Sequence, residues 1–196
     1  MNRKIYTFIA TSLLVFSLAA CSNTSQSNPT SKSDSTSQST KKESSHEVKN
    51  ITGTKAMQIK IPDGTDGEST VTETIGYDGD DFTSLKIEVL QPLPKQIKDE
   101  IGGRSIDEVK GQLIEAMGRL DIVQNLKKVN GTKVDLDVTG DSQMKFVFTF
   151  DMKTVDKSDL SQASDGRFNL DKLDSTTPME YILDLAQAGA KPVAAK

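Results

Sequence analysis

The segment from Met144 to Met152 places a large apolar side chain at every second position, and this pattern constrains the fold more than any other stretch. A period of two predicts a β-strand with one buried face and one wet face. An antiparallel sheet that is covered on one side only meets that requirement. The apolar row consists of Met144, Phe146, Phe148, Phe150 and Met152.

Four further segments combine apolar residues at alternate positions with a turn signal or proline at their ends. The first stops at Pro-Asp-Gly, the second at Asp-Gly, and the third before two prolines that cannot join a hydrogen-bonded ladder. We therefore predict an antiparallel meander of three strands, followed by a strand pair that includes the Met144–Met152 row. The four segments are residues 54–61, 69–77, 82–89 and 133–139.

Two helices are indicated by their start signals. Ser105-Ile106-Asp107-Glu108 has the spacing of a capping box, and apolar residues then follow at helical intervals as far as Leu120. Residues 122–126 could prolong this helix. Thr177-Pro178-Met179-Glu180 supplies a capping threonine, a proline at the first helical position and Glu180 at the third, as in a capping box, and Gly189 suits the end. We predict an α+β fold: an antiparallel sheet of about five strands packed on one face by two main helices.

The first twenty residues have the layout of a secretory signal peptide. Arg3 and Lys4 form a short basic start, and sixteen mainly apolar residues follow from Ile5 to Ala20. A membrane-spanning helix is the alternative, but such a helix needs about 20 apolar residues. This run is shorter and is interrupted by threonine and serine, so we favour a signal peptide at residues 1–20.

The end of that segment, Leu18-Ala19-Ala20-Cys21, resembles the lipobox of bacterial lipoproteins. The resemblance implies that Cys21 receives a diacylglyceryl group through a thioether. It also implies that Leu18, Ala19 and Ala20 are recognised by a signal peptidase, which cleaves before the cysteine. Two acyl chains give a stable membrane anchor where one is marginal. We therefore expect a protein held by its lipid on the extracytoplasmic face of a cell membrane.

Residues 21–45 are predicted to be the lipidated cysteine and a disordered tether. Fourteen of the twenty-four residues after Cys21 are serine or threonine, and such a composition cannot bury enough apolar surface to fold. Residues 46–196 have the length of one α+β domain. Cys21 is the only cysteine of the chain, so no disulfide can form within it.

The charge of the predicted domain excludes some partners. The whole chain has 24 basic and 28 acidic residues, of which five basic and two acidic ones lie in residues 1–45. The remainder is 19 basic and 26 acidic residues, a net charge of −7 with the histidine neutral. Nucleic acid is therefore not an expected partner, since phosphate binding needs a basic patch. We expect a monomer.

No motif of the chain predicts catalysis. His46 is the only histidine and lies beside the predicted tether, where a catalytic arrangement would lack a rigid frame. Two groups of acids lie close together in the sequence, the pair Asp135 and Asp137 and the three residues Asp78, Asp80 and Asp81. We interpret both groups as solvated carboxylates. We expect neither an enzyme nor a cofactor.

One acidic turn contains oxygen ligands of the kind that calcium prefers. Asp63, Asp66 and Glu68 lie beside two glycines in the segment PDGTDGE, but their spacing differs from that of an EF-hand loop. Turn formation explains the same residues. We therefore expect no metal site, and a calcium titration would test this.

Four stretches together resemble the small YehR-like lipoproteins of bacteria, over about residues 50–193. They are TVTETIGYDGDDFTSLKIEV, SIDEVKGQLIEAM, KKVNGTKVDLDVTGDSQMKFVFTFDM and YILDLAQAGAKPV. The resemblance implies an α+β fold on a lipoprotein of the bacterial envelope. It implies no biochemical activity.

Two classes of function are compatible with these observations. The first is a binding or interaction module at the cell surface, whose partner is a protein or a glycan. The second is a carrier or sensor of a small apolar ligand held between the sheet and the helices. The row of methionines and phenylalanines from Met144 to Met152 suggests this class. Such a row is more often simply core. We expect the first class.

Overall fold

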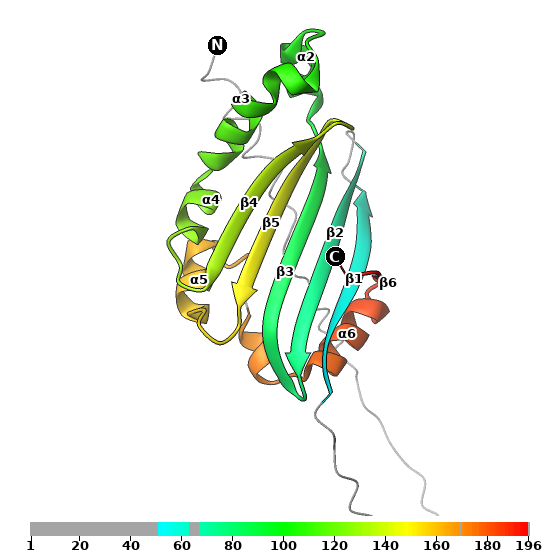
Figure 1. The fold of residues 1–196 in the computed structure, drawn as a ribbon, viewed down its shortest axis with the longest axis vertical. Coiled ribbons are helices and arrows are strands. Elements are labelled where there is room, and N and C mark those ends of the chain that lie inside the picture. The colour runs from blue at the N-terminus through cyan, green and yellow to red at the C-terminus, as the bar shows by residue number, and fades with distance from the viewer. Residues whose placement is uncertain (1–50, 63–66, 169, 196) are drawn as a thin grey trace, which may run out of the picture.

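The computed structural model describes residues 51–62, 67–168 and 170–195. Within them six strands form one antiparallel sheet in the order β4-β5-β3-β2-β1-β6 (Figure 1). The prediction of an antiparallel sheet of about five strands is confirmed, and the short β6 is an addition. The strands are β1 (Thr52–Pro62), β2 (Glu68–Asp78), β3 (Asp81–Pro92), β4 (Thr132–Thr139), β5 (Gln143–Asp151) and β6 (Lys191–Val193).

The strand register brings the apolar positions of neighbouring strands onto one face. Ile87 on β3 pairs with Phe148 on β5, and Val89 pairs with Phe146. A shift of one residue would turn this whole set toward water, so the buried face fixes the register. The predicted row is correct for its first four members, but β5 ends at Asp151 and Met152 follows it as a half-buried residue.

The two predicted main helices are α3 (Ile106–Gly118) and α6 (Pro178–Gln187). Figure 1 shows α3 beside β4, near one edge of the sheet, and α6 beside β1, near the opposite edge. Their buried residues belong to one hydrophobic core with the apolar face of the sheet. Shorter elements complete the fold: α2 (Lys95–Ile101), α4 (Asp121–Leu126), α5 (Lys157–Ala163) and the 3-10 turn η2 (Asp171–Asp174).

Both predicted capping boxes are present. The Ser105 hydroxyl accepts from the backbone N–H of Glu108 at 3.4 Å, and the Glu108 carboxylate accepts from the N–H of Ser105 at 2.8 Å. At α6, Thr177 and Glu180 make the equivalent pair of bonds at 3.3 and 2.9 Å. Each box satisfies two backbone donors that a helix start leaves unpaired.

The first helix does not continue through residues 122–126. It ends at Gly118, and Leu120 has extended backbone angles that make it the N-cap of α4. Leu120, Val123 and Leu126 are buried, so the break lets α4 turn its own apolar side to the core.

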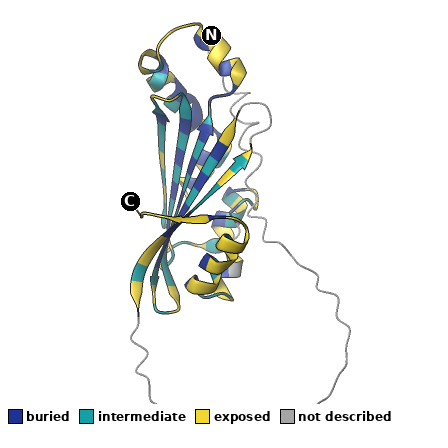
Figure 2. Ribbon diagram, turned by 90° about the vertical axis from the view of Figure 1, so that its right-hand side faces the viewer, coloured by how far each residue is buried: buried dark blue, intermediate teal, exposed yellow. Residues whose placement is uncertain are grey.

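The aromatic row of β5 is packed against a loop that the sequence pattern left unassigned. The ring centroid of Phe168 lies 5.0 Å from that of Phe148 and 5.4 Å from that of Phe150. Phe146 and Phe148 stack at 6.3 Å. Figure 2, coloured by burial, shows that buried residues follow the strands, while much of the helix surface is exposed. None of the described helices is long and apolar enough to cross a membrane.

Candidate functional site

A buried carboxyl lies on the core face of β2. Glu73 is 6% exposed, and its neighbours in the ladder are Met57 on β1 and Ile87 on β3. Its Oε2 accepts a hydrogen bond of 2.7 Å from the hydroxyl of Tyr181 on α6. The sequence carried a signal for this site, because Glu73 is an acid at an alternate position that otherwise faces the core. The bond ties the last helix to the middle of the sheet.

The environment of this pair shifts both groups toward their neutral forms. Burial raises the pKa of Glu73 above its ordinary value of 4.5, and the hydrogen bond from Tyr181 partly offsets that effect. Burial and the nearby Glu73 carboxylate also raise the pKa of Tyr181. The Tyr181 ring packs edge-on against Phe82 at 5.8 Å. Because both polar groups lie among packed side chains, we interpret the pair as a structural link.

An open cavity of about 650 Å³ lies where the β2–β3 turn meets the start of α6. Two of its acids are already engaged: Asp78 accepts from the Thr52 hydroxyl at 2.8 Å, and Asp174 is ion-paired with Lys157. With five carboxylates against two lysines, the lining is net negative. Its charged residues are Asp78, Asp80, Asp81, Lys153, Lys157, Asp174 and Glu180.

The structure separates the two groups of carboxylates that the sequence singled out. Asp135 pairs with Lys133 at 2.7 Å, and Asp137 pairs with Lys110 of α3 at 2.7 Å. The hydrogen bond from Lys110 lowers the pKa of Asp137. These two acids are therefore engaged in separate surface ion pairs and do not form an acid and base couple. The group at the β2–β3 turn lines the cavity instead.

The outer side of α6 exposes two large apolar side chains. Met179 is 64% exposed and Leu183 is 57% exposed, and they are one helical turn apart. Glu180 and Asp184 form a second row beside them at the same spacing. We call these four residues the α6 surface. The sequence analysis did not predict this surface: Met179 and Leu183 have helical spacing, but the sequence does not show which side of the helix the sheet covers.

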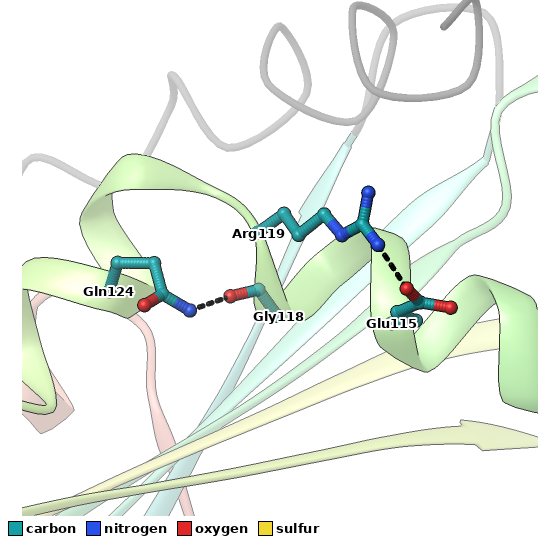
Figure 3. A network of polar contacts seen from close by, with 4 residues as sticks. All are labelled: Glu115, Gly118, Arg119 and Gln124. Carbon is teal, nitrogen blue, oxygen red and sulfur yellow. Dashed lines mark hydrogen bonds and ion pairs between the residues drawn. The ribbon is translucent and has the colours of Figure 1, made fainter. Parts of the chain in front are cut away.

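The outer side of α3 and its junction with α4 carry polar contacts instead. Figure 3 shows the Arg119 guanidinium bonded to Glu115 and the Gln124 side chain donating to the Gly118 carbonyl. The first contact is an ion pair one turn apart, and the second joins the two helices at the break between them.

The uncovered face of the sheet is polar, and several of its side chains pair with each other. Lys145 on β5 meets Glu88 on β3 at 2.9 Å. The Gln58 amide donates to the Thr72 hydroxyl across β1 and β2 at 3.0 Å. Cross-strand pairs of this kind stabilise a sheet that has one wet face. This face therefore differs from the α6 surface, where apolar side chains are exposed.

Several predicted residues lie outside the part of the chain that the structure describes. They are Leu18, Ala19, Ala20, Cys21 and His46, together with Asp63 and Asp66 of the acidic turn. The predicted signal and tether at residues 1–45 fall there too. Among the described residues, no three His, Cys, Asp or Glu side chains are grouped so that they could hold a metal ion.

Comparisons with known proteins identify the family of the chain and a solved structure of similar fold. A YehR-like family model matches residues 51–185, and the chain belongs to that family. An NMR structure of a protein from Streptococcus pneumoniae TIGR4 is 26% identical, with a TM-score of 0.62, and the match covers 85% of this chain and 100% of that one. The NMR structure of the E. coli YehR protein is 19% identical, with a TM-score of 0.49, covering 75% and 94%. No curated protein matches the chain.

Proposed function

We propose that this protein is a lipid-anchored binding module on the extracytoplasmic face of a bacterial cell membrane. It acts by contact with a protein or glycan partner and not by catalysis. The observation that carries the binding role is the α6 surface, where Met179 and Leu183 are exposed side by side. Single exposed apolar residues are ordinary, whereas contiguous exposed apolar surface is typical of a contact site.

The anchor part of the proposal is supported by the lipobox-like sequence and the serine-rich segment after it. Cys21→Ser removes the only thiol that could carry the lipid. We expect the variant to stay unprocessed or to leave the membrane fraction, whereas Ser27→Ala in the tether should leave both unchanged. Fractionation with detergent extraction and a mass measurement of the processed chain test this. A Cys21→Ser chain of processed size that still partitions with lipid would contradict the anchor.

The packing of the interior supports a surface binder over a carrier of an apolar ligand. Phe146 and Phe150 are fully buried, and Phe148 is 2% exposed. Phe146 stacks with Phe148, and Phe148 and Phe150 both contact Phe168, so protein side chains already occupy the space beside the row. The open cavity at the end of the sheet is lined by charged residues, which do not suit an apolar molecule.

Site-specific photocrosslinking in intact cells tests the binding role. The full chain would carry p-benzoylphenylalanine in place of Leu183, and a matched chain would carry it in place of Asp141, an exposed residue at the opposite end of the sheet. We expect a discrete adduct from position 183 that is absent from position 141. Identical adducts from both positions, or none from position 183, would count against a binding surface on α6.

A further inference from the structure

We infer that the α6 surface binds a cationic amphipathic helix of a partner peptide. The inference rests on the proposed binding role of this surface and adds the chemistry of the partner. It is carried by the placement of an apolar row and an acidic row side by side on one exposed helix, next to an acidic cavity.

The two rows follow from the helical repeat. Residues four apart lie on the same side of a helix, so Met179 and Leu183 form one row, and Glu180 and Asp184 form the next. The buried residues Pro178 and Ile182 face the sheet and leave both rows outside. The sequence of α6, PMEYILDLAQ, contains two acids and no basic residue. A partner that covers α6 therefore meets an apolar strip along an acidic one.

The cavity at the start of α6 extends the negative charge. Glu180 belongs both to the acidic row and to the lining of the cavity, together with Asp80 and Asp81 of the β2–β3 turn. Lys157 is engaged by Asp174, which reduces its effect on an approaching cation. The cavity is open and about 650 Å³ in volume, so it can receive the ends of long basic side chains. The charge thus continues beyond the helix itself.

This charge selects among the possible occupants of the exposed apolar strip. A second copy of the chain would bring more carboxylates and no basic residue of α6 to the contact, and an anionic lipid surface would repel the same carboxylates. A helix with lysine or arginine beside its apolar residues gains both apolar burial and charge complementarity. Amphipathic helices commonly bind in this way, through apolar anchors at spacings of three and four residues. The observations therefore favour a basic amphipathic peptide.

The test uses the full chain in phosphatidylcholine vesicles and a synthetic peptide of about four helical turns. The peptide has leucine at helical spacing, lysine elsewhere and a central photocrosslinker. We expect crosslinks that map to Met179 or Leu183 by mass spectrometry. We expect at least about tenfold weaker binding to Met179→Ser/Leu183→Ser, which corresponds to a loss of about 1.4 kcal/mol. Salt of about 1 M should weaken binding, since it reduces the screening length to about 3 Å.

Matched controls distinguish the electrostatic contribution to binding from nonspecific binding of the peptide. Asp184→Lys should weaken binding several-fold, whereas Asp141→Lys makes the same charge change at the opposite end of the sheet and should not. A scrambled peptide of the same composition lacks the apolar strip and should bind weakly. Circular dichroism of each variant checks that it remains folded, and a double variant that unfolds is replaced by Leu183→Ser alone.

Several outcomes would overturn the inference. Equal binding to Asp184→Lys and wild type, crosslinks that spread over the molecule, or binding explained entirely by empty vesicles would each do so. Crosslinks between copies of the chain would indicate self-association instead. If the basic peptide fails while the adduct at position 183 forms in cells, the partner chemistry is wrong and the binding role stands. If both fail, the binding role is wrong as well.

Discussion

The helices α3 and α6 begin in the same way and differ on their outer sides. Each starts with a capping box, and each buries its apolar side against the sheet. The outer side of α3 is polar, and its residues Gln112 and Glu115 are exposed. The outer side of α6 exposes Met179 and Leu183. Folding explains the whole of α3 but only the inner side of α6.

This difference distinguishes apolar residues that stabilise the fold from apolar residues that are available to a binding partner. A helix on a sheet is stabilised by one apolar side, and its other side is free to be polar. The apolar side chains on the outer side of α6 are more than half exposed in the isolated chain and add little to its core. They are therefore the residues whose presence a contact would explain.

The largest expected effect is in the core beneath α3. Leu113→Ala removes a side chain that is 2% exposed and should lower the free energy of unfolding by about 2–5 kcal/mol. Gln112→Ala, at the exposed neighbouring position, should change it by less than about 0.5 kcal/mol. Urea denaturation followed by circular dichroism measures both. A small loss at Leu113 would mean that α3 is not packed as described.

The link between α6 and the sheet is expected to matter next. Tyr181→Phe keeps the ring that packs on Phe82 but removes the donor to the buried Glu73 carboxyl. Leaving a buried polar group unpaired costs about 1–3 kcal/mol. We expect a loss of that size in urea denaturation. Tyr77→Phe changes a half-buried tyrosine on the same sheet and serves as the control, with an expected loss below about 1 kcal/mol.

The raised pKa of Glu73 should give the folded protein a specific pH dependence. Burial holds the folded pKa above the ordinary 4.5, so the folded state binds the proton more tightly than the unfolded state. The stability contributed by the neutral carboxyl is present below 4.5 and is lost as the pH rises through the folded pKa. The slope in that window is at most about 1.4 kcal/mol per pH unit.

Glu73→Gln removes this titration, so the difference in stability between variant and wild type should shift in favour of the variant as the pH rises. Urea denaturation at a series of pH values measures the difference. Glu88→Gln removes a carboxyl from the opposite face of the sheet and should leave the Glu73 dependence in place. Parallel pH curves for Glu73→Gln and wild type would refute the assignment.

The two capping boxes should contribute nearly equally. Ser105→Ala and Thr177→Ala each remove a side-chain acceptor at a helix start, and each should cost about 1 kcal/mol. Thermal or urea denaturation compares the two losses directly. A much smaller loss at Thr177 would show that α6 is held mainly by its side-chain contacts with the sheet.

The sequence predicted the parts of this fold that depend on local signals. The capping boxes at Ser105 and Thr177 are read within four residues, and the β5 row needs only its own alternation. The strand β6 could not be predicted in this way, because Pro192 weakens any strand signal. It forms because Ala56–Gln58 of β1 offers an unpaired edge, which is a property of the tertiary fold.

The candidate site was less predictable for the same reason. The sequence signal for Glu73 is only an acid at an otherwise apolar position, which the strand prediction did not use, and its partner Tyr181 lies 108 residues away in the chain. The α6 surface depends on which side of the helix the sheet covers. The sequence of α6 contains apolar residues on both sides of the helix. Which of them are exposed is decided by the packing of α6 on the sheet.

The smallest expected effect on stability is at the α6 surface, and it completes the comparison. Leu183→Ala is the same substitution as Leu113→Ala, but Leu183 is 57% exposed and removing it leaves no cavity. We expect a change below about 0.5 kcal/mol in urea denaturation. The same variant should nevertheless reduce binding of the basic peptide at α6. A loss of several kcal/mol would show that Leu183 is part of the core, and its exposure would then no longer support a contact with a partner.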